Sequence, residues 1–302
     1  MSAVISRMSS GQMAGSYLSD LRGIYSSLAD AQEAVTTGKS MLRPSDDPVG
    51  IAISLGLRRD AAAVTAWQRN IHDSLTWLGT TDNSLGQALE VVQKAAELAI
   101  QGGNGTLSQE ARNLIADAVE GLKSQFVEVG NSSLGGRFIF GGTATDTRPF
   151  DPATEVATVP VNTGLVSREV SRGAVVSINI TADRLQGPGG ATPDIFTALD
   201  DLATALRAND SGDITGDLDV FDVHKDNISM LRGEMAAKIN RLELTAGRFD
   251  SQRIATNEQL GELEGVDIAE AIITFGQRET VYKAALAAGA RITQPSLMDF
   301  LR

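Results

Sequence analysis

Residues suited to acid–base or metal chemistry are scarce in this chain. It has two histidines, His72 and His224, and no cysteine. Neither histidine stands in a His-Glu-x-x-His arrangement, which places two imidazoles on one helix face to bind zinc. We therefore expect each histidine to be a solvated or partly buried helix residue. The lack of cysteine also removes disulfides, thiol catalysis and thiolate metal sites.

Two other patterns resemble functional sites. Residues 102–106, Gly-Gly-Asn-Gly-Thr, suggest a phosphate loop, but the lysine that would reach the phosphates is missing and no strand pattern precedes the loop. We interpret the stretch as a turn in which Thr106 caps a helix starting at Leu107. The neighbouring carboxylates Asp46 and Asp47 point in different directions at a helix start, so they do not form an acid–base pair. The sequence predicts neither an enzyme nor a cofactor or metal site.

Composition narrows the function classes further. The chain has 302 residues and a formal net charge of −12. A nucleic-acid binder or a protein of anionic membrane surfaces needs a basic face, so this charge argues against both. There is no apolar stretch long enough to span a bilayer, and the first thirty or so residues lack the pattern of an ordinary secretory signal.

The elements that dominate the sequence are long helices at both ends. Apolar residues at alternating steps of four and three predict a helix to about Thr37 with a narrow seam for a partner helix. The seam residues are Tyr17, Leu21, Ile24, Leu28, Ala31 and Val35. A last helix over about 266–292 is predicted to bury Ile268, Ile272, Phe275, Tyr282 and Leu286. Further helices are expected over about 47–100, 107–131, 192–208 and 217–263.

Between these helices the periodicity changes. Short β-branched or aromatic runs at 138–140, 156–161 and 174–180 predict strands, and the Gly-Pro-rich residues 186–190 close the segment as a linker. The helix that follows is expected to have Thr192 as its N-cap and Pro193 at its first helical position. The fold class is therefore mainly α with a small β-rich inserted domain. We expect a folded-back rod of long helices whose terminal helices pair as a coiled coil.

Two motifs carry a resemblance to a known family. The first spans Arg43–Gly50 and includes Ser45, Asp46, Asp47 and Pro48; by itself it also fits an ordinary capped helix start. The second, residues 136–143, contains Arg137, Phe138, Phe140, Gly141, Gly142 and Thr143. Together with C-terminal pieces at 238–243, 266–271 and 297–302, they resemble the bacterial flagellin superfamily. The Ser-Asp-Asp-Pro form is more similar to hook-filament junction proteins than to ordinary flagellin.

The resemblance implies a domain division and a set of partners. Residues 1–43 with 265–302 would form a terminal coiled-coil domain, 44–137 with 191–264 a helical rod, and 138–190 a small outer domain. The assembly interface would use the seams of the two terminal helices. Implied partners are the other hook-associated junction protein, flagellin, an export chaperone, the type III export apparatus and further copies in a helical ring. The location would be the extracellular flagellum, reached without a cleaved signal peptide.

Physical chemistry is consistent with assembly through the ends. Burying the apolar residues of one narrow seam stabilises a helix by less than the conformational entropy that ordering its backbone costs. The terminal helices are therefore expected to be poorly ordered until partner surfaces cover them. Two alternatives stay open at this point: flagellin itself, the filament subunit, and a secreted helical adhesin or effector.

Overall fold

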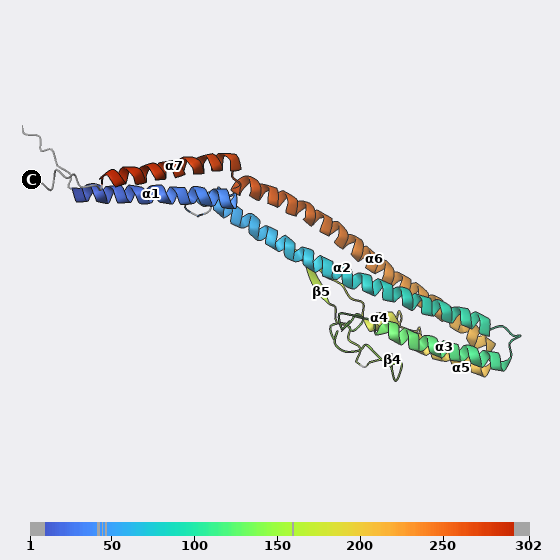
Figure 1. Ribbon diagram of the computed structural model, residues 1–302. Helices are drawn as coiled ribbons and strands as arrows, with labels where there is room; N and C mark the ends of the chain where they lie inside the picture. Colours follow the sequence, from blue (N-terminus) through green and yellow to red (C-terminus); the bar gives the residue numbers. More distant parts are fainter. Residues whose placement is uncertain (1–9, 41–42, 44, 46, 159, 293–302) are drawn as a thin grey trace, which may run out of the picture. The chain divides into compact units, whose positions relative to one another are not determined.

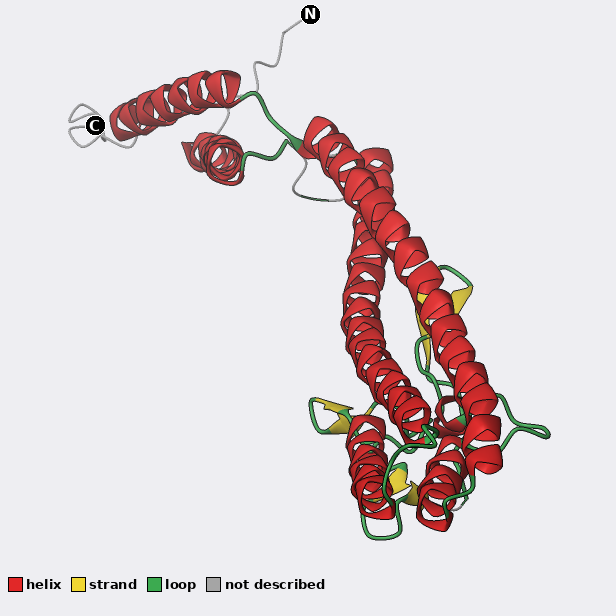
Figure 2. Ribbon diagram, turned by 90° about the vertical axis from the view of Figure 1, so that its right-hand side faces the viewer, coloured by secondary structure: helices red, strands yellow, loops and turns green. Residues whose placement is uncertain are grey.

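A computed structural model describes residues 10–40, 43, 45, 47–158 and 160–292. The chain divides into two compact units. One is Ala63–Ser251, and the other is formed by the two ends of the chain, before Ala63 and after Ser251. Helices dominate both units, and the strands are few and short (Figure 2). The mainly α fold class predicted from the sequence is confirmed.

The first unit is built on the terminal helices α1 (Ser10–Thr37) and α7 (Ile268–Ile292). They lie side by side at the blue and red ends of the ribbon in Figure 1, as the coiled-coil prediction requires. The same unit contains the first turns of α2 (Pro48–Gly102) and the last turns of α6 (Ser211–Glu264). Helix α7 begins after Asp267, whose Oδ1 accepts hydrogen bonds from the backbone N–H groups of Ala269 and Glu270.

The second unit holds the large apolar core. Here α2 and α6 pack through a stacked ring pair, Trp67 on Phe249, with centroids 5.7 Å apart. An ion pair fixes the same two helices further along, where Arg232 Nε donates to Asp82 Oδ1 at 2.9 Å. Apolar side chains on α2 and α6 share one buried cluster with those of the inserted segment.

Helices α3 (Gln109–Gly130) and α5 (Ile195–Ala208) pack closely against each other in this unit. Phe126 meets Phe196 edge to face at 5.5 Å, which is a favourable aromatic geometry. Lys123 of α3 reaches both carboxylate oxygens of Asp200 on α5 at 2.8 Å. The apolar contact and the ion pair together set the register of the two helices.

The inserted segment contains less strand than its sequence suggested. Three separate antiparallel hairpins form, each of two strands. They are β1 (Ser133–Leu134) with β2 (Arg137–Phe138), β3 (Phe150–Asp151) with β4 (Val156–Ala157), and β5 (Ser167–Ser171) with β6 (Ala174–Ser177). A short helix, α4 (Ala182–Gln186), follows. The apolar runs become core anchors instead of longer strands: Ile139, Phe140, Ile178 and Ile180 are fully or almost fully buried.

Three helix starts differ from the sequence predictions. Helix α3 is capped by Ser108, whose Oγ accepts a hydrogen bond from Ala111 N, so Thr106 is not the cap. Helix α5 is capped by Asp194, which places Pro193 before the helix and overturns the prediction for Thr192. Helix α6 begins at Ser211, about two turns earlier than expected.

The two histidines have structural surroundings. His72 is exposed on α2, as expected. His224 is more deeply buried than predicted, and its Nε2 lies 3.0 Å from the carbonyl oxygen of Pro193. Desolvation lowers the pKa of His224 below its ordinary value of 6.5, so the ring is neutral near neutral pH and Nε2–H donates to that carbonyl. His224 thus holds the segment leading into α5 against α6.

Candidate assembly interface

The contact between α1 and α7 is close because small residues of α7 lie under large ones of α1. Tyr17 donates its hydroxyl hydrogen to the backbone oxygen of Ala285 at 2.6 Å. A Cβ atom on Gly289 would lie 2.1 Å from Tyr17 Oη and 2.3 Å from Cζ, so the tyrosine ring occupies the space that glycine leaves open. Further along, Arg278 donates to the backbone oxygen of Ser27 at 3.0 Å.

The α1 side of this contact matches the predicted seam. Tyr17, Leu21, Ile24, Leu28 and Val35 are all half-buried, and Ala31 is buried. A 4–3 spacing of apolar residues therefore identified the face that α1 turns toward its partner. Tyr25, beside the seam, also meets the ring of Tyr282, with centroids 5.8 Å apart.

The prediction for α7 is only partly right. Phe275 and Tyr282 are half-buried, whereas Ile268, Ile272 and Leu286 are exposed, so the structure does not bring these three to a buried side. The face toward α1 follows a different 4–3 series that contains both small and large residues. Its members are Ala271, Phe275, Arg278, Tyr282, Ala285 and Gly289. Small residues allow two helices to approach more closely than an isoleucine–leucine seam does. Because these small residues are only weakly hydrophobic, the spacing of large apolar residues does not reveal the series.

A second apolar surface remains uncovered on this helix pair. Within the described residues, large apolar side chains on both helices are about half exposed or more. They are Leu18 and Tyr25 on α1, and Ile268, Ile272, Ile273, Val281 and Leu286 on α7. Large apolar side chains exposed in this number on two paired helices fit a segment that another molecule covers. Three of the predicted interface residues belong to this uncovered surface.

The same unit contains a charged joint centred on Glu264, the last residue of α6. Its carboxylate accepts hydrogen bonds from the Ser54 hydroxyl and from Arg58 Nε at 2.9 Å, both on α2. Lys39, just beyond α1, places its Nζ 3.1 Å from Oε2. The backbone oxygen of Glu264 also accepts from Ser40 N at 2.7 Å. One carboxylate therefore connects the end of α6 with the start of α2 and the segment after α1.

Backbone pairing completes this joint. Lys39 and Gly265 form an antiparallel bridge, and Val266 N donates to the oxygen of Gly38 at 3.1 Å. Hydrogen bonds from Arg58 and Ser54 lower the pKa of Glu264 from 4.5 to about 2, so the carboxylate is charged at all ordinary pH values. We call Lys39, Ser40, Ser54, Arg58 and Glu264 together the Glu264 joint. The joint connects the end of α6 with the start of α2 and with the segment after α1.

The Ser-Asp-Asp-Pro motif forms the start of α2. Asp47 Oδ1 accepts hydrogen bonds from Val49 N at 3.0 Å and Gly50 N at 2.9 Å, and Pro48 is the first helical residue. This is the predicted capping role, and it is confirmed for Asp47 and Pro48. Asp46 lies outside the described residues.

The second motif, residues 137–143, folds as a tight turn anchored in the core. Phe140 is fully buried, and Phe138 is half-buried. Gly142 has a φ of +61°, and a Cβ there would lie 2.4 Å from the backbone oxygen of Asn162. Thr143 donates its backbone N–H to Asn162 Oδ1 at 3.1 Å. The glycine is thus required by backbone conformation and by close packing.

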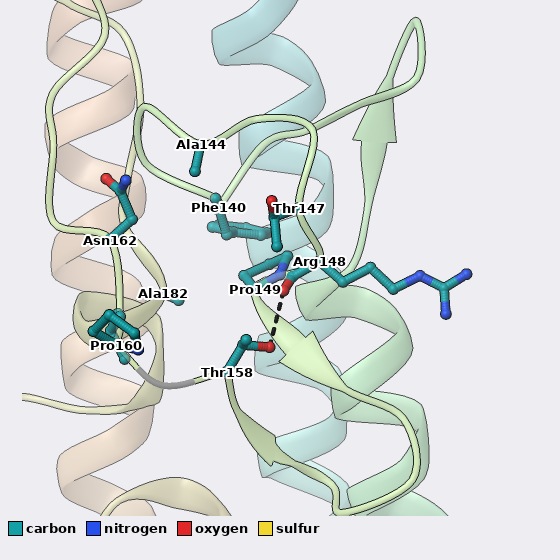
Figure 3. A pocket seen from close by; sticks show the side chains of 11 residues that line it. Phe140, Ala144, Thr147, Arg148, Pro149, Thr158, Pro160, Asn162 and Ala182 are labelled. Carbon is teal, nitrogen blue, oxygen red and sulfur yellow. Dashed lines mark hydrogen bonds between the residues drawn. The ribbon is translucent and has the colours of Figure 1, made fainter.

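A hollow of about 260 Å³ lies beside this turn (Figure 3). Phe140, Thr147, Pro149 and Pro160 are among its lining residues, and Thr158 donates its hydroxyl hydrogen to the Arg148 backbone oxygen at 2.9 Å. The guanidinium of Arg148 extends away from the other side chains (Figure 3). The lining is mostly apolar and the hydroxyl of Thr158 is satisfied by a backbone oxygen, so this hollow has the character of a packing gap under a loop.

Among the described residues no cluster of three or more His, Cys, Asp or Glu side chains could hold a metal ion. In that same part of the chain, no helix combines the length and apolarity needed to cross a membrane.

This chain has paired terminal helices with apolar seams, and these are joined to long inner helices. Helical subunits of this class include the bacterial flagellins. Residues 8–145 match the model of the bacterial flagellin N-terminal helical region, and 218–301 match that of the C-terminal helical region. These matches cover both ends and most of the chain. The chain belongs to the bacterial flagellin superfamily.

Individual relatives agree with this assignment. The chain is 24% identical over 295 residues to flagellar hook-associated protein 3 of Escherichia coli strain K12, covering 90% of this chain and 93% of the relative. It is also 25% identical over 276 residues to flagellin of Bacillus subtilis strain 168, covering 87% and 88%. Among solved structures, flagellar hook associated protein-3 from Legionella pneumophila has a TM-score of 0.60 at 14% identity, covering 68% of this chain and 98% of that one.

Replacing Gly289 with alanine tests the close approach of α7 to α1. The added Cβ displaces the Tyr17 ring and breaks its hydrogen bond to Ala285. We expect amide hydrogen exchange around Ala285 to accelerate severalfold. The matched control is Gly276→Ala on the same helix, where a Cβ meets nothing within 4 Å and only the gain in helix propensity remains. Equal exchange in both variants would contradict the proposed packing.

Replacing Glu264 with glutamine tests the joint. The variant leaves Arg58 and Lys39 without their counter-charge, so the amides of Ser40 and Val266 should exchange about tenfold faster, equivalent to roughly 1.4 kcal/mol. Because folding lowers the pKa of Glu264, its carboxylate contributes fully to stability above pH 4.5. This contribution is lost as the pH falls toward 2. The difference between wild type and Glu264→Gln should shrink over that range.

The control for this experiment is Glu262→Gln, which removes an exposed carboxylate from the same helix end. Its amide exchange should match that of the wild type. If Glu264→Gln behaves like this control at neutral pH, the joint contributes nothing to the order of the unit.

Proposed function

We propose that this chain is a structural subunit of the bacterial flagellum at the junction between hook and filament. Family membership restricts it to flagellin-type subunits, and hook-associated protein 3 of Escherichia coli is among its relatives over nearly the full length of both chains. One observation about this chain carries the assembly mechanism: the helix pair α1–α7 leaves a second apolar surface uncovered. A surface of this kind suits a subunit that other subunits enclose.

The assembly interface in this proposal has two faces. Tyr17, Leu21, Ile24, Leu28 and Val35 of α1, together with Phe275 and Tyr282 of α7, serve the pairing within the chain. Ile268, Ile272 and Leu286 instead serve contacts with neighbouring subunits. Burial of each such side chain against a neighbour contributes about 1.5–3 kcal/mol, so a few of them make assembly favourable.

The proposal includes the division and partners that the resemblance implied. Residues 1–43 and 265–302 form the inner assembly domain, residues 44–137 with 191–264 the middle helical part, and residues 138–190 the outward part. The chain travels unfolded through the type III export apparatus, bound beforehand by an export chaperone. It then meets another hook-associated protein on one side and flagellin on the other, and is located outside the cell.

Deletion of the gene tests the junction role directly. Cells should keep their hooks, lose their filaments and release unpolymerised flagellin into the medium, as electron microscopy and analysis of the medium would show. The nearest alternative is a filament subunit, which the similarity to Bacillus subtilis flagellin favours. Filaments composed of this chain in wild-type cells would establish that alternative and contradict the junction role.

The uncovered surface is tested by Ile272→Asp in the deletion strain. Because Ile272 is 53% exposed in the single chain, the purified variant should unfold at the same temperature as the wild type. It should nevertheless fail to restore filaments, since a charge is costly to bury between subunits. Gln277→Asp, an exposed polar position on the same helix, is the matched control and should restore them. Full restoration by Ile272→Asp would remove this residue from the interface.

A further inference from the structure

The turn that joins α2 to α3 has no part in the proposed function. Residues 102–106 read Gly-Gly-Asn-Gly-Thr, the stretch that first suggested a phosphate loop. The turn lies at the right-hand end of the ribbon in Figure 1, and Asn104, Gly105 and Thr106 are all exposed. Asn104 is also the only asparagine in the chain that a glycine follows. Its side chain therefore meets water beside a residue that has no side chain of its own.

The side chain of Asn104 is held in a hydrogen-bonded turn. Its Oδ1 accepts a hydrogen bond from the backbone N–H of Thr106 at 3.1 Å and another from the Thr106 hydroxyl at 2.9 Å. A turn of this kind folds the side-chain carbonyl back over the following peptide unit. The carbon atom Cγ of Asn104 is thereby brought toward the backbone nitrogen of Gly105.

The backbone nitrogen of Gly105 is accessible. Among the described residues, no acceptor takes a hydrogen bond from the Gly105 N–H. A Cβ atom built on Gly105 would meet nothing within 4 Å, so the space around this residue is open. The nitrogen can therefore lose its proton to water and approach Cγ of Asn104 without breaking a contact within the fold.

From this geometry we propose that Asn104 is a self-modifying site that converts to aspartate and isoaspartate, with water as the other reactant. The Gly105 nitrogen loses its proton and forms a bond to Cγ of Asn104. The tetrahedral intermediate then breaks its bond to Nδ2, which takes up a proton and leaves as ammonia. The two donors of Thr106 stabilise the negative charge that develops on Oδ1, as an oxyanion hole does.

Water completes the reaction by opening the five-membered imide ring. Attack at Cγ breaks the bond between Cγ and the Gly105 nitrogen and leaves aspartate at position 104. Attack at the backbone carbonyl carbon of residue 104 instead leaves isoaspartate, in which the main chain runs through the former side chain. Either product adds a negative charge to the turn.

The isoaspartate product also changes the contacts of the turn. The backbone oxygen of Asn104 accepts hydrogen bonds from Leu107 N at 3.2 Å and from Arg112 Nη2 at 3.0 Å. Arg112 is buried, and its Nε donates to the backbone oxygen of Gly102 at 3.0 Å. Isoaspartate lengthens the main chain after residue 104 and displaces this oxygen, so the bond from Leu107 N is weakened. The reaction is independent of the junction role, and it is tested without flagella.

The test incubates the purified full-length chain in mildly alkaline buffer, which favours loss of the Gly105 proton. Mass spectrometry with fragmentation should show that residue 104 gains the mass difference between O and NH, and an isoaspartate-specific methyltransferase should label it. Asn131 is the internal control, because its Oδ1 and Nδ2 both bond to the backbone of Phe150 and a serine follows it. No mass gain at residue 104, or an equally fast gain at Asn131, overturns the proposal.

Three variants test the mechanism. Gly105→Ala should slow the reaction about tenfold, since a side chain on residue 105 hinders the approach of its nitrogen. Thr106→Val removes the hydroxyl donor and should slow the reaction several fold, whereas Thr106→Ser keeps that donor and should react at the wild-type rate. Both positions are exposed, so each variant should keep the circular dichroism spectrum of the wild type. Equal rates for Thr106→Val and Thr106→Ser, or an unchanged rate for Gly105→Ala, contradict this mechanism.

Discussion

The hydrogen-bonded carboxylate of Glu264 is the contact on which the order of the terminal unit depends. The carboxylate accepts hydrogen bonds from α2 and pairs with Lys39 in the segment after α1. Glu264 is also the last residue of α6, and α7 follows it in the chain. The ends of α1 and α6 and the starts of α2 and α7 are thus all close in sequence to residues of this joint. A group this well paired has its pKa lowered to about 2, so the carboxylate is charged at ordinary pH values.

Beyond the joint, the helix pair α1–α7 shows two kinds of packing. Its inner face relies on small residues, with Tyr17 lying over Gly289 and bonded to Ala285. Its outer face leaves isoleucine, valine and leucine side chains exposed. A pair held by a narrow contact gains little from its own burial, and it gains much more when neighbours cover the outer face. We therefore expect the terminal helices to depend on assembly for their full order.

How far the sequence predicts this structure varies from element to element. The seam of α1 was predicted because large apolar residues recur at steps of four and three. The corresponding face of α7 was predicted only at Phe275 and Tyr282, because Ala271, Ala285 and Gly289 carry little hydropathy and nearby exposed isoleucines carry more. Local capping was also ambiguous: Thr106 and Ser108 both suit a helix start, and only the folded chain selects Ser108. The Glu264 joint connects Glu264 with Ser54 and Arg58, which lie more than 200 positions earlier in the sequence. Local sequence patterns do not predict a contact over such a separation.

We infer that the terminal helices become fully ordered only when other subunits cover them. Limited proteolysis of the free chain and of the same chain in isolated flagella compares the two states directly. We expect rapid cleavage within α1 and α7 of the free chain, slow cleavage within 63–251, and protection of both terminal helices after assembly. Equal resistance of α1 and α7 in the free and assembled states would contradict it.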